Sequence, residues 1–150
     1  MRPNIGRAIG GGLVGTLAMT LMIYLVAPMM GVKMDIAGSL AGMLGTSWTV
    51  GLIMHLINGT VIFPLIYALV LFRVLKGGQA VKGAEWGVIL WLVAQLVVMP
   101  MLGAGVFSLK TGGPMAAMAS LIGHLVYGSL LGAVAGGASK ATARLSAARA

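Results

Sequence analysis

The sequence predicts an all-α integral membrane protein: one domain over residues 1–150, built as a four-helix transmembrane bundle of two duplicated helical hairpins with both termini cytoplasmic. Composition is the first observation, since 59% of the residues are hydrophobic, 8% are charged and the mean hydropathy is +1.04. A soluble domain has roughly 25% charged residues. Apolar runs of about 20 residues without strand-like alternation are the second observation, because lipid admits only helices or closed barrels. The third is an internal repeat.

The first predicted helix covers residues 8–30. Arg2 and Arg7 precede this apolar run, and a positive start followed by an apolar stretch also describes a signal peptide. The run is too long for the apolar region of a signal peptide, and no Ala-x-Ala-like cleavage site follows Pro28. We therefore expect a retained membrane span.

The second predicted helix covers residues 48–72 and follows a glycine-rich loop over residues 31–47. Ser47 suits the N-cap position, where a hydroxyl accepts a hydrogen bond from the first helical turn. Pro64 should kink the helix, because proline lacks the backbone donor and clashes with the preceding turn.

The third and fourth predicted helices cover residues 85–102 and 115–137. A basic linker over residues 73–82 precedes the third helix, and a second glycine-rich loop over residues 103–114 separates the two. Glu85 would then stand at the start of the third helix, where a carboxylate interacts favourably with the helix dipole.

The basic residues predict how the bundle is oriented. In a four-span arrangement eight of them fall on one side of the membrane and two on the other, and the side richer in lysine and arginine is the cytoplasmic one. Both termini are therefore predicted to be cytoplasmic. The eight are Arg2, Arg7, Arg73, Lys76, Lys82, Lys140, Arg144 and Arg149, and the two are Lys33 and Lys110.

The residues that are missing exclude several kinds of chemistry. The chain has no cysteine, which excludes disulfides, thiolate metal sites and cysteine nucleophiles. Its only acidic residues, Asp35 and Glu85, lie near predicted helix ends, so neither a mid-membrane carboxylate site nor a serine–histidine–acid triad is available. No folded basic surface supports nucleic-acid binding. We expect a protein that is not an enzyme.

One histidine motif occurs twice. Residues 52–60 and 121–129 share the pattern Leu-Ile-x-His-Leu-(Ile/Val)-x-Gly-(Thr/Ser), which contains the only two histidines, His55 and His124. A Pro-Met pair also occurs near the end of both helix one and helix three, as Pro28-Met29 and Pro100-Met101. Duplicated two-helix units keep one orientation in the membrane, so the repeat places both histidines at a similar depth.

Glycines spaced four residues apart share a helix face with each histidine. Small residues at this spacing let helices approach closely in lipid, where packing drives association. Both histidines should therefore point into the bundle. The predicted helix-packing residues are Gly51 and Gly59 beside His55, Gly128, Gly132 and Gly136 beside His124, and Gly11 and Gly15 on the first helix.

The histidine pair supports a cofactor hypothesis. Imidazole is a good ligand for haem iron and copper, and facing helices hold cofactors in this way. Thioether sulfur suits Cu(I), and Met99 and Met118 are the candidates to join His55 and His124 in a metal site. They belong to a larger group of methionines near the same membrane face, namely Met29, Met30, Met34, Met43, Met99, Met101, Met115 and Met118.

A structural role for the two histidines is the interpretation we favour. An imidazole can bond a neighbouring hydroxyl, amide or carbonyl between helices, and Gln95, with Trp91 on the same helix face, is the predicted neighbour. Methionine, moreover, commonly fills gaps in apolar cores. In this interpretation the protein has no cofactor.

Several segments resemble a family of small bacterial four-span membrane proteins of unknown function. The resemblance is carried by residues 11–19, His55–Gly59, Trp91, residues 98–107 and His124–Gly132. It covers most of the chain, and its most specific parts are the Pro-Met-Leu-Gly-Ala-Gly-Val-Phe run and the two His-x-x-x-Gly motifs. The resemblance implies a four-span fold and brings no established activity.

The predicted function is that of an accessory or structural protein of the bacterial inner membrane, as a subunit of a larger complex or as a homo-oligomer in contact with lipid. The first alternative is a b-type haem or copper protein that uses the paired histidines. The second is a small permease, for which few side chains could form a polar path. They are Thr16, Thr20, Asn58, Thr60, Gln95 and Ser129.

Overall fold

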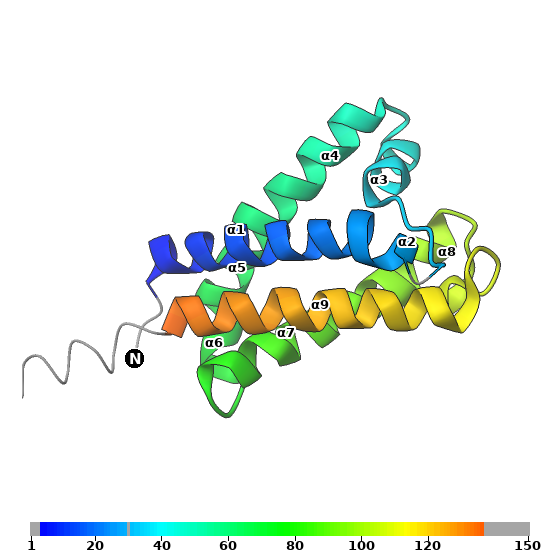
Figure 1. The fold of residues 1–150 in the computed structure, drawn as a ribbon. Coiled ribbons are helices and arrows are strands. Elements are labelled where there is room, and N and C mark those ends of the chain that lie inside the picture. The colour runs from blue at the N-terminus through cyan, green and yellow to red at the C-terminus, as the bar shows by residue number, and fades with distance from the viewer. Residues whose placement is uncertain (1–3, 30, 137–150) are drawn as a thin grey trace, which may run out of the picture.

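A computed structural model describes residues 4–29 and 31–136, and within these ranges the protein is all-α. Four long helical stretches form a bundle, and a shorter fifth helix, α3, joins the first two (Figure 1). Arg2, Met30, Lys140, Arg144 and Arg149, which entered the sequence-based predictions, lie outside the described residues.

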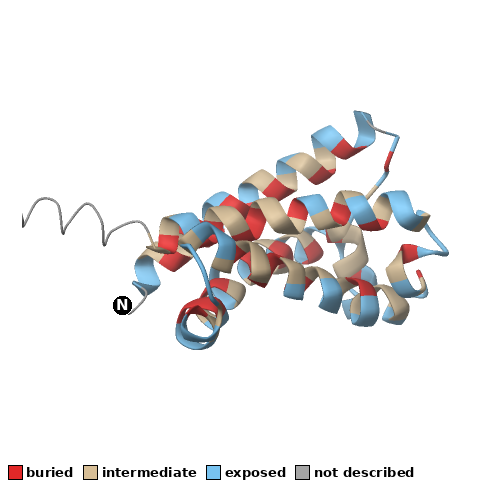
Figure 2. Ribbon diagram, turned by 90° about the horizontal axis from the view of Figure 1, so that it is seen from below, coloured by how far each residue is buried: buried red, intermediate tan, exposed pale blue. Residues whose placement is uncertain are grey.

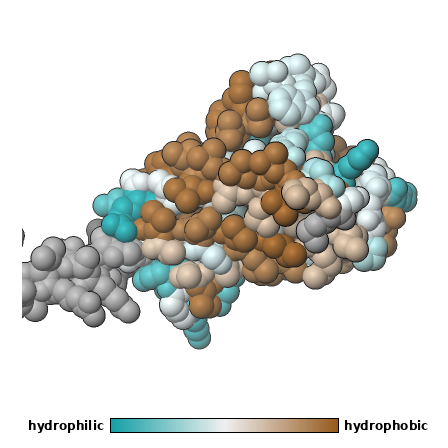
Figure 3. All heavy atoms as spheres, in the orientation of Figure 1, coloured by the Kyte–Doolittle hydropathy of each residue, from teal (hydrophilic) through white to brown (hydrophobic). Residues whose placement is uncertain are grey.

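Each long stretch is long and apolar enough to span a membrane, which indicates a multi-pass membrane protein and confirms the four predicted spans at this level. An apolar surface lies between more polar ends (Figure 3). The spans are Ile5–Met29, with α1 (Ile5–Leu21) and α2 (Ala27–Met29); Trp48–Val74, with α4 (Trp48–Ile57), α5 (Phe63–Ile66) and α6 (Phe72–Val74); Gln79–Met101, with α7 (Gln79–Val93) and α8 (Met99–Met101); and Gly113–Gly136, which is α9.

Three of the spans contain a π-helical turn that ends two residues before a proline. These turns are Met22–Val26 before Pro28, Asn58–Ile62 before Pro64 and Ala94–Val98 before Pro100. Proline has no backbone N–H and crowds the preceding turn, so the hydrogen-bond ladder shifts locally. The span containing Pro64, where we expected a kink, therefore continues through a wider turn.

The core lies where α9 packs against α1 and α7, and the second span adds Tyr67, Ala68 and Phe72 to it. Buried residues follow the inward sides of the helices while the outward sides are exposed (Figure 2). Tyr67 and Leu131 are fully buried, and Tyr127 is 2% exposed. Large exposed aliphatic residues on the outer faces, such as Leu25 at 60% and Leu69 at 60%, suit a lipid environment.

The prediction of a loop over residues 31–47 was wrong, because this segment contains α3 (Ile36–Leu44). The carboxylate of Asp35 caps its first turn by accepting a hydrogen bond from the Gly38 amide at 2.9 Å. Gly45 ends the helix with φ 62°, a left-handed conformation that glycine adopts easily. Both signals were in the sequence, but the glycine content concealed them.

The helix ends differ most from prediction at α7, which begins at Gln79 and not at Glu85 or Trp86. Glu85 therefore lies inside the helix, and its predicted position at the helix start was wrong. The predicted linker shortens to the residues between Val74 and Gln79, because Lys82 now belongs to α7, where its amino group donates to the Phe72 carbonyl at 2.9 Å.

Candidate functional site

His55 projects from α4 toward the first span. It is 8% exposed, and its Nε2 lies 3.0 Å from the Thr20 hydroxyl of α1. That hydroxyl also donates to the Thr16 carbonyl at 2.7 Å. His55 therefore faces the bundle interior and is held by a hydroxyl on a neighbouring helix.

His124 projects from the middle of α9 and is half-buried. Its Nδ1 lies 2.8 Å from the carbonyl oxygen of Ser120, one turn earlier, and 3.4 Å from the Ser120 hydroxyl. A Cβ atom on Gly87 of α7 would collide with the His124 carbonyl, so the two helices are in backbone contact at this level. This contact fixes the height of His124 in the bundle.

Both histidines line one cavity of about 640 Å³. Its lining residues include Thr16, Phe63, Leu90 and Tyr127, which lie about halfway along their spans. The cavity lies within the size range of small-molecule sites, which are mostly apolar with a few polar groups. The sequence predicted two inward-facing histidines, and the structure places both on the wall of the same space.

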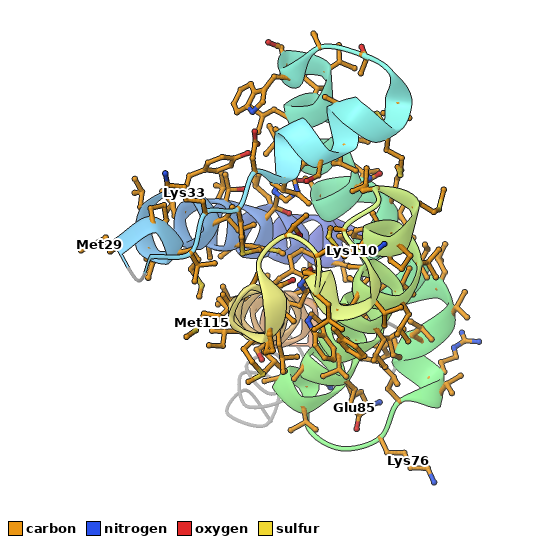
Figure 4. All side chains as sticks on the ribbon, turned by 90° about the vertical axis from the view of Figure 1, so that its right-hand side faces the viewer. Met29, Lys33, Lys76, Glu85, Lys110 and Met115 are labelled. Atoms are coloured by element: carbon orange, nitrogen blue, oxygen red, sulfur yellow. The ribbon has the colours of Figure 1, made fainter. Side chains whose placement is uncertain are left out.

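The cavity reaches the end of the bundle that carries Lys33 and Thr111, where both residues are exposed. Figure 4 looks onto this end, with Lys33 and Lys110 in the upper half of the view and Lys76 and Glu85 near the bottom. Helix α3 borders the opening through Ile36, among others. Val93, which is 48% exposed and lies inside a span, is also among the lining residues.

Most of the predicted packing glycines lie in close helix contacts. A Cβ atom on Gly128 would collide with the Gly83 carbonyl, and one on Gly132 with the Gln79 carbonyl. Gly51 differs, because a Cβ atom there would collide with the Ala37 carbonyl of the short helix α3 and not with another long helix. The remaining contacts are Gly11 with Leu131, Gly15 with Tyr127, Gly59 with Thr16 and Gly136 with Gln79.

Gln95 and Trp91 do not hydrogen-bond to either histidine. Gln95 is 2% exposed and lines the cavity, where its Oε1 accepts from the Ser108 hydroxyl at 3.0 Å. The Trp91 indole donates to the Ala117 carbonyl at 2.9 Å and does not line the cavity. Gln95 is thus a cavity residue, and Trp91 holds α7 against α9.

The predicted methionine group is divided by the structure. Met99 lines the cavity, together with Met34 and Met43. Met118 is 54% exposed and does not line it; Met29, Met101 and Met115 are exposed as well. In the part of the chain that is described, no three histidine, cysteine, aspartate or glutamate side chains are grouped as metal ligands. The metal-ligand donors that line the cavity are two imidazoles, several thioethers and the Asp35 carboxylate at its opening.

Three hydrogen bonds that position the site were not predicted. The Tyr127 hydroxyl donates to the Gly59 carbonyl at 2.8 Å and ties α9 to the first hairpin below the cavity. Asp35 accepts from the Tyr24 hydroxyl at 2.8 Å and from the Trp48 indole at 3.0 Å, which fixes α3 at the cavity opening. Asp35, Tyr24 and Trp48 were visible in the sequence, but no sequence pattern indicated that they contact one another.

Comparison with protein families places the chain in a known group: residues 2–146 match the model of DUF6789, a family of unknown function. The chain belongs to the DUF6789 family. This match covers nearly the whole chain and agrees with the family resemblance at that level. No curated protein and no solved structure matches it.

Proposed function

We propose that this DUF6789 protein is a non-enzymatic accessory protein of the bacterial plasma membrane that binds a small, lipid-soluble molecule between its helices. The observation that carries the proposal is the cavity of about 640 Å³ with both histidines on its wall. A purely structural bundle would bring these side chains into close packing, because voids forfeit contacts.

Access to the cavity supports a ligand that arrives from the membrane. Val93, a half-exposed lining residue inside a span, would give the cavity a border on the lipid-facing surface, while the opening near Lys33 would connect it to the aqueous side. The opposite end is blocked by the buried side chains of Tyr67 and Leu131. A cavity that opens to water at only one end of the bundle is suited to binding a ligand. The same shape would also be expected for one state of a small permease.

The orientation and origin of the bundle are part of the proposal. The described basic residues Arg7, Arg73, Lys76 and Lys82 belong to the end opposite Lys33 and Lys110, which favours cytoplasmic termini. The π-helical turns Met22–Val26 and Ala94–Val98 occupy corresponding positions of the two Pro-Met repeats, which supports duplicated hairpins. The cavity would then open on the non-cytoplasmic side.

Copper or b-type haem binding is the second candidate. His55, His124 and Met99 border the same cavity, and imidazole with thioether is a donor set that fits Cu(I). Two imidazoles are also the axial ligands of many b-type haems. An absorption spectrum and elemental analysis of the protein extracted from membranes separate this candidate from an organic ligand.

The proposal is tested by filling the cavity. Gly42 lines the cavity, and no atom lies within 4 Å of where its Cβ would be, so Gly42→Trp begins its large side chain in open space. Native mass spectrometry of the protein should show a bound molecule that is absent from Gly42→Trp. Gly10→Trp is the matched control, because Gly10 is equally unobstructed and does not line the cavity.

Equal mass spectra for the wild type and Gly42→Trp, with no molecule on either, would contradict cavity binding. A Soret band or stoichiometric copper that disappears in both His55→Ala and His124→Ala would replace the organic ligand with the second candidate.

A further inference from the structure

The hydrogen bonds of the two histidines fix which ring nitrogen carries the proton. The Ser120 carbonyl can only accept, so His124 donates through Nδ1–H at 2.8 Å. The Thr20 hydroxyl has one hydrogen, which it donates to the Thr16 carbonyl. Toward His55 this hydroxyl therefore accepts, and His55 donates through Nε2–H at 3.0 Å.

The remaining nitrogens, Nδ1 of His55 and Nε2 of His124, are unprotonated in the neutral rings. Neutral rings are expected here because an unpaired charge is costly inside a membrane. An unprotonated ring nitrogen is a hydrogen-bond acceptor. The two imidazoles thus offer two acceptors and no further donor.

The residues that carry these two acceptor nitrogens both line the cavity. Neither nitrogen has a hydrogen-bond partner among the described residues. The buried side-chain nitrogen and oxygen atoms that lack a partner in the described part of the chain are on other residues: Tyr67 Oη, Gln79 Oε1 and Trp86 Nε1. The acceptor nitrogens are therefore not sealed in the core, and the open space beside both residues is the cavity that they line.

Most of the rest of the cavity wall is apolar and includes Met19, Ile23, Phe63 and Leu90. Its polar members include the amides of Asn58 and Gln95, and Lys33 and Asp35. An apolar wall favours an apolar ligand body, and the few polar groups of a pocket orient the ligand. The complementary molecule has a hydrophobic body and a head group that donates hydrogen bonds.

We propose that the cavity binds a neutral, lipid-soluble molecule with two hydroxyl donors on an apolar body, of the chemical class of a quinol. One hydroxyl donates to His55 Nδ1 and the other to His124 Nε2. The inference rests on the proposed function and names the chemistry of its ligand. A monoacylglycerol carries the same pair of hydroxyls, so the two sources are separated by experiment.

The test compares a quinol with its own quinone on the full-length protein in nanodiscs. The two molecules have the same body, but the quinone oxygens only accept and would face unprotonated nitrogens. The probe is a tritiated short-tail benzoquinol, kept reduced by excluding oxygen. Its retention should exceed that of the corresponding benzoquinone by about tenfold or more, because the quinone would place an acceptor opposite each acceptor nitrogen. This comparison needs no variant and so does not depend on variant folding.

Variants then assign the preference to the histidines. His55→Phe and His124→Phe should each lower quinol retention about tenfold and reduce the preference over quinone. Met118→Leu is the matched control, because Met118 lies on α9 outside the cavity, and it should leave both values unchanged. Monoacylglycerol retained with the same histidine dependence would support the hydroxyl chemistry and identify a lipid as the source.

Other outcomes overturn the inference. Equal retention of quinol and quinone, or a preference for quinone, refutes the donor head group while leaving cavity binding intact. Stoichiometric Cu(I) binding that is lost in both histidine variants replaces the hydroxylated ligand with a metal. If no molecule is retained and Gly42→Trp changes nothing, the proposed function itself fails.

Discussion

The two hairpins carry the same histidine motif but pack in different ways. In the second hairpin α7 lies against α9 backbone to backbone, since a Cβ on Gly83 would collide with the Gly128 carbonyl. In the first hairpin α4 leans away from α1 and α9, and α3 lies beside it (Figure 1). The glycine that precedes His55 by one turn, Gly51, contacts α3 at the Ala37 carbonyl.

The position just before each motif has a different contact in each hairpin. The counterpart of Gly51 in the second hairpin is Ser120, which lines the cavity and accepts the hydrogen bond from His124. The first hairpin uses this position to hold α3, and the second uses it to orient an imidazole. Corresponding positions thus make different contacts in the two hairpins: α7 and α9 pack tightly, whereas α4 leans away from α1.

The tight hairpin should be the most sensitive to added volume. Gly83→Ala places a Cβ against the Gly128 carbonyl oxygen, and backbone atoms cannot move aside as a side chain can. We expect a loss of about 2–3 kcal/mol in the free energy of unfolding, in the range of overpacked sites. Unfolding of the detergent-solubilised protein, followed by circular dichroism, measures this loss.

Gly10→Ala is the matched control for this substitution. No atom lies within 4 Å of a Cβ at Gly10, and alanine favours a helix over glycine by up to about 1 kcal/mol. The control should therefore be neutral or stabilising. Equal destabilisation by the two substitutions would show that the Gly83 contact does not set the packing of α7 on α9.

The open hairpin should respond locally. Gly51→Val directs two methyl groups at the Ala37 carbonyl, which should displace α3 without unfolding the bundle. We expect amide exchange over residues 36–44 to accelerate about tenfold or more, while exchange in α9 stays unchanged. Hydrogen exchange with mass spectrometry measures both, and Gly42→Ala, which meets no atom within 4 Å, is the control on α3.

Accelerated exchange in α9 of Gly51→Val would contradict the division of the molecule into a tight and an open hairpin.

The four spans and the inward faces of the histidines followed from local pattern. Apolar length defines a span, and a four-residue glycine spacing defines a helix face. These properties depend on neighbours along one helix. The bond between His55 and Thr20 was not predictable in this way, because it joins two helices whose relative rotation is set by packing throughout the bundle.

Helix α3 and the cavity could not be predicted from local sequence patterns. Residues 36–44 contain glycines that resemble a loop, and only the cap at Asp35 and the end at Gly45 indicate a helix. The cavity depends on α4 leaning away from the bundle, which no residue in α4 encodes alone. The same limit explains why Gln95 was paired with a histidine in prediction and with Ser108 in the structure.

The smallest expected effect concerns the attachment of α3 at the cavity opening. Partial burial raises the pKa of the Asp35 carboxyl, but hydrogen bonds from the Gly38 amide, the Tyr24 hydroxyl and the Trp48 indole outweigh burial, so this pKa is lowered. The contribution of Asp35 to stability is therefore present above its unfolded pKa of about 3.9 and is lost as the pH falls through the lower folded pKa.

Removing the cap tests this attachment directly. Asp35→Ala should destabilise α3 by about 1 kcal/mol, the usual effect of losing an N-cap. Trp48 fluorescence, taken as the difference from Trp48→Phe, should change in the wild type as the pH falls through the lowered pKa of Asp35, where its carboxylate becomes protonated. Asp35→Asn still caps a helix but cannot titrate, so its fluorescence should not change there. If both proteins respond equally to acid, the carboxylate does not hold α3 at the cavity, and the open hairpin owes its shape to the Gly51 contact alone.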